Sequence, residues 1–310
     1  MKENRDIVQK ADFLLADLAP GGILESTQAN RFIQLAIDQS VVMPMMTRVD
    51  MNAPKELREK IRYGSRALRK GTEATALPDA LRSKPSTSKI ELDAQLVKAE
   101  THVSFEALED SIERGTFEST IRATLAERIG LDLEDLAFNG DTTSADSLLK
   151  TLNGFIVSAT TNIVAGGGAT LQRSVLKDTL KTMPSEFRRD KRSLRYLTAD
   201  EANIDYQDHL GDRATPLGDD QVGAMESRPY HSIQVVGVPV FPTNLGAGTN
   251  ETVVLMTDPG NMLFGVWRQI RFDTDRDVSA GVYIIVVTAR VDFKFAHEPA
   301  VVKTTGVVAV

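Results

Sequence analysis

Histidine, cysteine and serine can act as bases, nucleophiles or metal ligands, and their number and spacing are informative in this chain. The four histidines, His102, His209, His231 and His297, are dispersed and form no HExxH motif or short-spaced pair, which favours structural or solvated roles over metal binding. The chain has no cysteine, which removes thiol nucleophiles and thiolate metal sites, and it has no GxSxG elbow. These absences argue against the common hydrolase and metalloenzyme designs.

Three further stretches have some features of ligand-binding sites, and in each a simpler interpretation is favoured. Gly166-Gly167-Gly168 lacks the GK[ST] ending of a P-loop and the GxGxxG spacing of a dinucleotide site, so we interpret it as a flexible loop. Asp273–Asp277 resembles the start of a calcium loop, but Val278 and Ile284 occupy the positions that need Gly and Glu, which favours a solvated acidic turn. The basic run Arg188–Arg192 could touch nucleic acid, although a solvated face or an intersubunit contact is commoner. We therefore expect no catalytic site, no metal and no cofactor.

The composition is that of a folded, acidic protein. With 310 residues, 42% of them hydrophobic and 25% charged, the chain is long enough for roughly two domains. The net charge of -7 argues against coating DNA with the whole surface, because phosphate binding needs clustered Lys and Arg. The N-terminus lacks the apolar core of a signal peptide, and runs such as Val282–Val287 are too short to span a bilayer. We expect a soluble, unsecreted protein with no membrane partner.

Residues 48–98 have the pattern of a long hairpin. The stretch Lys89–Leu96 alternates polar and apolar residues with the period of a strand, and the middle, Gly64–Ser88, is polar with few large apolar residues. A lone two-stranded ribbon is marginally stable in water. Such a hairpin therefore needs a surface to lie on, which is the first indication of assembly.

The clearest helix follows, from Ser104 to Asn139. Ser104 is a good N-cap, acidic residues occupy the first turn, and Asn139-Gly140 forms a stop signal. Apolar residues recur every four positions along it, at Phe117, Ile121, Leu125 and Ile129. We expect the helix to be kinked or interrupted at Gly115 and Gly130. Residues 150–268 indicate a compact α+β unit, and 266–307 return to strands. The predicted fold class is α+β.

Several of these segments resemble the major capsid proteins of tailed bacteriophages, which have the Hong Kong 97-type fold. The matching pattern is KIELDAQLVKAETHVSFEALEDS, then TFESTIRATLAERIGLDLEDLAFNGD and LNGF, across Lys89–Phe155. The closing stretch DFKFAHEPAVVKTTG is similar to the last strand of the family's peripheral (P) domain. The run Val235–Val240 is similar to a strand of its axial (A) domain. The resemblance covers about residues 26–306.

The resemblance implies a domain plan and a role. It implies an N-terminal arm (1–36), a P domain built from 37–47, 96–150 with a spine helix, and 269–310, an E-loop hairpin (48–95), and an A domain (151–268). The implied function is a structural subunit without enzymatic activity that self-assembles as hexamers and pentamers into the icosahedral shell around double-stranded phage DNA. Implied partners are a portal and a separate scaffold protein, with a decoration protein left open. The implied location is the virion, after assembly in the host cytoplasm.

Two alternatives stay open from the residues alone. An encapsulin, a bacterial compartment shell with the same fold, would hold a cargo enzyme instead of DNA. A soluble α+β enzyme with an unrecognised site would form a small oligomer around a pocket of ionisable groups.

The sequence departs from the family pattern in two places. Members often carry a scaffolding region before the arm, and Met1 lies too close to the spine for one, which implies a separate scaffold or none. The type member also joins an E-loop Lys to a P-domain Asn with help from a Glu. Lys70 or Lys84 could supply the amine, but no Asn follows Asn261, and Arg290 lies near the expected Glu. We expect a shell without covalent cross-links.

Charge predicts how the hairpin docks. Residues 48–98 carry 12 Lys and Arg against 7 Asp and Glu, a net of +5, whereas residues 104–141 carry 3 against 10, a net of -7. Together with the resemblance, this favours the hairpin of one subunit lying across the spine helix of its neighbour, with a fold-back within one chain as the alternative. The contact candidates are Arg66, Arg69 and Lys70 at the tip, facing Glu106, Glu109, Asp110 and Glu113.

Overall fold

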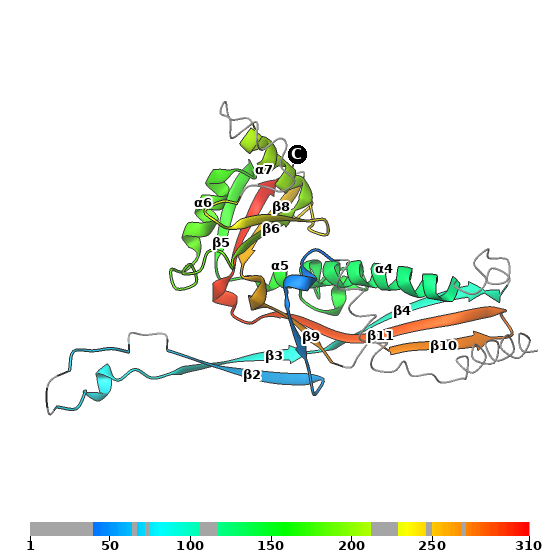
Figure 1. Ribbon diagram of the computed structural model, residues 1–310, viewed down its shortest axis with the longest axis horizontal. Helices are drawn as coiled ribbons and strands as arrows, with labels where there is room; N and C mark the ends of the chain where they lie inside the picture. Colours follow the sequence, from blue (N-terminus) through cyan, green and yellow to red (C-terminus); the bar gives the residue numbers. More distant parts are fainter. Residues whose placement is uncertain are drawn as a thin grey trace, which may run out of the picture.

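The computed structural model contains two stacked layers and a hairpin that projects from the lower one (Figure 1). It describes residues 40–63, 67–71, 73, 75–105, 117–211, 229–245, 250–267 and 271–309. The expected N-terminal arm therefore lies outside the described residues. A long sheet with helix α4 forms the lower layer, and a second sheet flanked by α6 and α7 forms the upper lobe. One continuous hydrophobic core extends through both layers.

The long sheet has five strands, ordered β1-β9-β11-β10, with β4 also pairing with β11. Their bounds are β1 Thr47–Asp50, β4 Gln95–Ser104, β9 Met262–Val266, β10 Arg271–Asp277 and β11 Val282–Phe295. Side chains at every second position of β11 are buried: Ile285, Val287, Ala289 and Val291. This is the period expected when one face of a strand packs on a core.

Helix α4, Phe117–Asn139, lies along this sheet (Figure 1). Its buried residues Ala126, Leu133, Leu136 and Ala137 belong to the same core as the buried face of β11. The predicted interruption at Gly130 is wrong, because the helix runs through this residue. A glycine costs a helix only about 1 kcal/mol relative to alanine, and packing over the whole apolar face outweighs that cost. Gly115 lies outside the described residues. Among the described residues, no helix has the length and hydropathy of a membrane span.

The upper sheet is ordered β5-β12-β8-β6-β7. Its strands are β5 Ile163–Thr170, β6 Arg195–Ala199, β7 Gln234–Val238, β8 Glu251–Thr257 and β12 Val302–Val308, with helices α6 Arg173–Thr182 and α7 Asp200–Gly211. The flexible loop expected at Gly166–Gly168 is instead part of β5. Gly167 and Gly168 have φ of +68° and +73°, and the register shifts opposite Thr305–Val307, so the glycines form an irregular stretch within a paired strand.

Two strands belong to a different sheet from the one that their place in the sequence suggested. Strand β9 lies within the expected 151–268 unit but pairs with β1 and β11 in the long sheet. Strand β12 lies within the expected 269–310 segment but pairs with β5 and β8 in the upper sheet. Strand β1, expected at the start of the E-loop, is an edge strand of the long sheet. Alternation predicts that a segment is a strand but carries no information about its pairing partner.

Two glycines, Gly140 and Gly154, lie in contact where the chain passes from α4 to the upper lobe. The N–H of Gly154 donates to the carbonyl of Gly140, 2.8 Å away, just before the short helix α5, Phe155–Ser158. A Cβ on Gly154 would lie 2.7 Å from the carbonyl oxygens of Ala137 and Phe138. The glycines of the NGD and LNGF motifs therefore allow two backbone segments to touch where no side chain fits.

Candidate subunit-contact surface

The hairpin consists of β2, Lys55–Arg62, and β3, Ser86–Asp93, which pair only with each other among the strands that the structure describes. Directly opposite residues of an antiparallel pair share a side of the ribbon. One side bears Lys60 and Arg62, whose head groups contact residues 296 and 297 of the body. We call this the body-facing side, and the other the outward side.

The outward side carries an apolar stripe that was not singled out from the sequence. Leu57, Ile61 and Tyr63 occupy odd-numbered positions on this side, with Glu59 between the first two, and are 60%, 70% and 60% exposed. Glu59 forms an exposed ion pair with Lys89 across the ribbon, 2.9 Å, and Glu91 and Thr87 lie on the same side opposite Leu57 and Ile61. Solvated surfaces carry single apolar side chains routinely, but a row of three on a ribbon without a core of its own indicates a contact surface. The alternation of β2 contained this signal.

The hairpin tip is basic and partly apolar. Arg69 and Lys70 are exposed, whereas Arg66 lies outside the described residues. Leu68 is 86% exposed, and Leu77 and Leu81, beside a short 3-10 turn at Asp79–Leu81, are 38% and 44% exposed. The tip is therefore less purely polar than expected.

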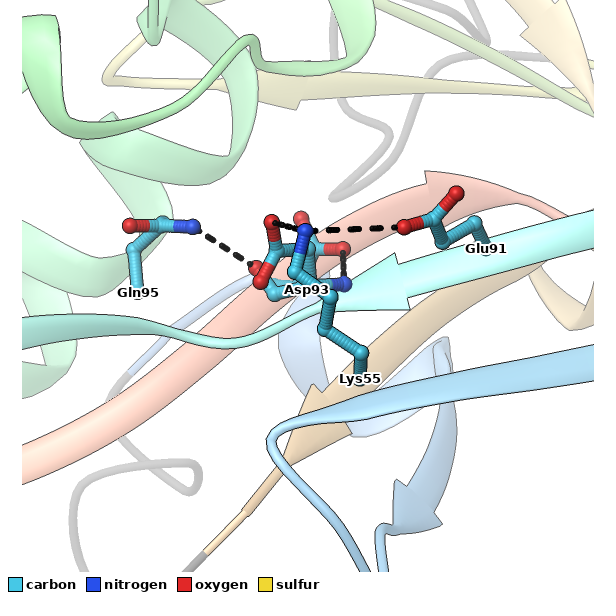
Figure 2. A network of polar contacts seen from close by, with 5 residues as sticks. Lys55, Glu91, Asp93 and Gln95 are labelled. Carbon is cyan, nitrogen blue, oxygen red and sulfur yellow. Dashed lines mark hydrogen bonds and ion pairs between the residues drawn. The ribbon is translucent and has the colours of Figure 1, made fainter.

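The root of the hairpin is fixed by a polar network (Figure 2). The Lys55 ammonium lies 2.8 Å from an oxygen of Asp93 and 3.6 Å from one of Glu91. The N–H of Asp93 donates to Asp292 Oδ2, 2.8 Å away, and Asp292 is only 2% exposed. Burial raises the pKa of Asp292. The hydrogen bonds that its carboxylate accepts from the N–H groups of Asp93 and Phe293 lower this pKa and so oppose the effect of burial.

Leu92 packs next to this network in a small separate core. Its partners are Val49, Met51, Ala94 and Leu263. The hairpin root is thus anchored in the long sheet, while the rest of the ribbon extends beyond it (Figure 1).

The predicted acidic partners, Glu106, Glu109, Asp110 and Glu113, lie outside the described residues, so the predicted charge pairs stay predictions. The structure shows other acidic groups on the long sheet. Asp273 on β10 and Glu100 on β4 both pair with Val286 of β11, so both lie on one side of the sheet. Asp275 and Asp277 follow on the same side. The run expected to be an acidic turn is thus a strand, β10, and Asp277 alone caps the following turn, accepting from the N–H of Ser279 and Ala280.

Nothing in the described residues forms a chemical centre. The four histidines lie in different segments, and no group of three or more His, Cys, Asp or Glu side chains in the described part of the chain could hold a metal. A cavity of 340 Å³ lies near the hairpin, lined by the loop after α6 and by the turns around Asp258 and His297. Its lining is mixed in charge and includes no nucleophile paired with a base.

Comparisons with known proteins agree with this arrangement. The family model described as the phage capsid family matches residues 21–306. A Bacillus subtilis (strain 168) protein named for a prophage capsid role, YqbE, is 33% identical over 308 residues, which cover 98% of this chain and 99% of that protein.

Solved structures show the same fold. The satellite phage P4 procapsid with its size determination protein has a TM-score of 0.69 at 14% identity, covering 97% of each chain. The capsid of a native GTA particle has a TM-score of 0.64 at 14% identity, covering 88% of this chain and 91% of that one. The SrpI encapsulin of Synechococcus elongatus has a TM-score of 0.58 at 10% identity, covering 86% and 87%.

At these identities the structures show the fold, which is the α+β Hong Kong 97-type capsid fold, and the family and sequence matches show the role. That role is structural and not enzymatic, as a component of the virion capsid. The chain therefore belongs to the phage capsid family, as a major capsid protein.

Proposed function

We propose that copies of this chain assemble in the host cytoplasm, as hexamers and pentamers, into an icosahedral head shell around double-stranded DNA. A portal and a separate scaffold protein complete the assembly. The satellite phage P4 procapsid, one of whose chains has the same fold, includes a size determination protein. This supports the proposal that a second protein takes part in assembly of the shell. DNA is enclosed without sequence-specific contacts.

The observation that carries this proposal is the hairpin. Its outward side exposes Leu57, Ile61 and Tyr63, and its tip exposes Leu68. Fully burying an apolar side chain contributes about 1.5–3 kcal/mol, and the described part of the subunit leaves more than half of each of these side chains exposed. A neighbouring copy of the chain supplies the missing surface.

We further propose that this hairpin lies on the P domain of the adjacent subunit, with charge fixing its position. Arg69 and Lys70, with Arg66, face acidic groups of the neighbour's spine region, Glu106, Glu109, Asp110 and Glu113. On the long sheet, Asp275 and Asp277 add to this negative surface, whereas Glu100 and Asp273 on the same side are paired with Lys98 and Arg271. Exposed ion pairs contribute only about 0.2–1 kcal/mol each, so charge sets register while the apolar stripe provides most of the affinity.

The pairing of strands supports a domain plan close to the expected one. We propose a P domain that comprises β1, β4, α4 and β9–β11, an E-loop from about 51 to 94, and an A domain from 151 to 261. The last strand, β12, joins the A domain.

Substitution on the outward side tests the docking. Leu57→Ser with Ile61→Ser removes most of the stripe and should prevent shell formation while leaving the subunit folded, as judged by circular dichroism. Lys89→Ala is the matched control on the same side of the ribbon, because its exposed ion pair with Glu59 contributes little. If the double variant forms shells as well as the control does, the stripe is not the contact.

Particle contents separate the two kinds of shell. A phage head made with portal and scaffold would contain double-stranded DNA, whereas an encapsulin would co-purify with a cargo enzyme. Nuclease-protected DNA in particles from an infected or induced host supports the head. A stoichiometric cargo enzyme and no DNA would support the compartment instead.

A further inference from the structure

A cluster around Arg62 joins the hairpin to two other parts of the same subunit. Arg62 Nη1 lies 2.8 Å from Nε2 of His297, in the segment that leads from β11 to β12. Its other terminal nitrogen forms an ion pair with Glu186, in the loop after α6. The guanidinium carbon lies 5.1 Å from the ring centre of Phe187, and that ring meets His297 edge-on at 5.3 Å. One side chain of the ribbon therefore contacts three neighbours on the body.

This contact requires a neutral His297. A guanidinium has only N–H donors, so the imidazole Nε2 that it approaches must be the acceptor, and the ring proton must reside on Nδ1. A protonated ring has no acceptor and carries a positive charge. It would face the guanidinium at hydrogen-bond distance with nothing to accept the bond.

We propose that Arg62, Glu186, Phe187 and His297 form a latch that holds the hairpin against the body at neutral pH and releases it when His297 gains a proton. The root stays anchored by Leu92 and by the bond from Asp93 to Asp292, so release pivots the ribbon and does not detach it. The latch lies within one chain and does not depend on the proposed shell.

The charges around His297 favour release. On the hairpin, Lys60 donates to the carbonyl of Ala296 at 2.6 Å, which places a second cation beside the ring. On the body, Glu186 opposes these cations, but its carboxylate is paired with Arg62. Arg189, Asp190 and Asp258 line the adjoining cavity with His297. Burial, then Arg62 and Lys60, lower the pKa of His297, while Glu186 acts in the opposite direction.

The sign of the pH effect follows from that direction. Because the pKa of His297 is lower in the latched state, the released state binds the proton more readily. The latch is fully favoured above the ordinary histidine pKa of about 6.5. It weakens as the pH falls below that value, until the pH drops below the lowered pKa of the latched state.

Spin-label distances within one chain test the proposal. The chain has no cysteine, so Thr87→Cys on β3 and Lys181→Cys at the end of α6 give two unique labelling sites outside the latch. Labelled chain is diluted into unlabelled chain so that only distances within a chain are measured. We expect a narrow distance distribution at pH 7.5 and a broadened one at pH 5.0.

Two substitutions of histidine by glutamine assign the effect to one residue. His297→Gln keeps an acceptor for Arg62 but cannot titrate, so its distribution should stay narrow at both pH values. His102→Gln, on β4, removes an exposed histidine and should respond to pH as the unsubstituted chain does. Arg62→Met should broaden the distribution at pH 7.5 already. An unchanged distribution in the parent chain, acid broadening that persists in His297→Gln, or loss of the response in His102→Gln would each overturn the latch.

Discussion

Adding one methyl group at Gly154 should destabilise the subunit strongly. The Cβ of Gly154→Ala would lie 2.7 Å from the carbonyl oxygens of Ala137 and Phe138 and 2.8 Å from the N–H of Gly140. All three atoms are backbone, so no rotamer change relieves the contact. The φ of Gly154 is -74°, which alanine adopts readily, so the cost is steric and not conformational.

The size of the effect follows from two losses. Overpacking of a closed interior site costs about 1–3 kcal/mol. Separating the segments also lengthens the 2.8 Å hydrogen bond from Gly154 to Gly140, a bond of a kind worth about 0.5–1.5 kcal/mol. We expect the free energy of unfolding to fall by about 2–4 kcal/mol, measured by urea denaturation of the unassembled subunit.

Gly71→Ala is the matched control. No atom lies within 4 Å of the Cβ that it adds, and its φ is not in the left-handed region. Its free energy of unfolding should therefore change by less than about 0.5 kcal/mol. Equal stabilities of Gly154→Ala and Gly71→Ala would refute the close approach of the two segments.

Three further results are expected. Reversal of the tip charges in Arg66→Glu, Arg69→Glu and Lys70→Glu should leave the subunit folded but impair assembly, with the defect eased by added salt because exposed charges are screened over about 8 Å at physiological ionic strength; normal particles at low salt would contradict the charge-guided docking. Boiling assembled particles in detergent should release one band at the 33.9 kDa of the chain, and a ladder of multimers would reveal a covalent cross-link. Thr179→Val should cost about 1–2 kcal/mol in urea denaturation by leaving the buried Thr304 hydroxyl, 2.6 Å away, without its partner, and adding Thr304→Val should recover part of that loss; additive losses would exclude the coupling.

The periodic segments were the part of the fold most accessible from sequence. The alternation of β3 and β4 predicted a hairpin arm, and the four-residue spacing of apolar side chains predicted α4. Both signals are local, because they depend on which face of one element is buried. The prediction of an interruption at Gly130 was wrong because whether a helix tolerates a glycine depends on contacts with the rest of the core, which are not local.

Pairing between distant strands could not be predicted in the same way. The apolar pattern of β12 fits either sheet, and only the three-dimensional arrangement places it between β5 and β8. The Gly166–Gly168 run looked like a loop, because its pairing with an irregular partner strand near Gly306 has no local sequence signal.

The proposed contact surface draws only in part on features that were recognised in the sequence. The basic tip was evident from charge, but the apolar stripe of Leu57, Ile61 and Tyr63 on the same hairpin was not predicted. The cluster of Arg62, Glu186 and His297 could not be predicted at all, since its members are separated by more than a hundred residues and are brought together by the tertiary fold.

Electron cryomicroscopy of purified particles tests the central claim most directly. An icosahedral reconstruction should contain hexamers and pentamers of this chain, with the hairpin of each subunit lying across the P domain of its neighbour and its outward apolar stripe covered. A small closed oligomer, or a shell in which each hairpin lies on its own subunit with that stripe exposed, would contradict the account.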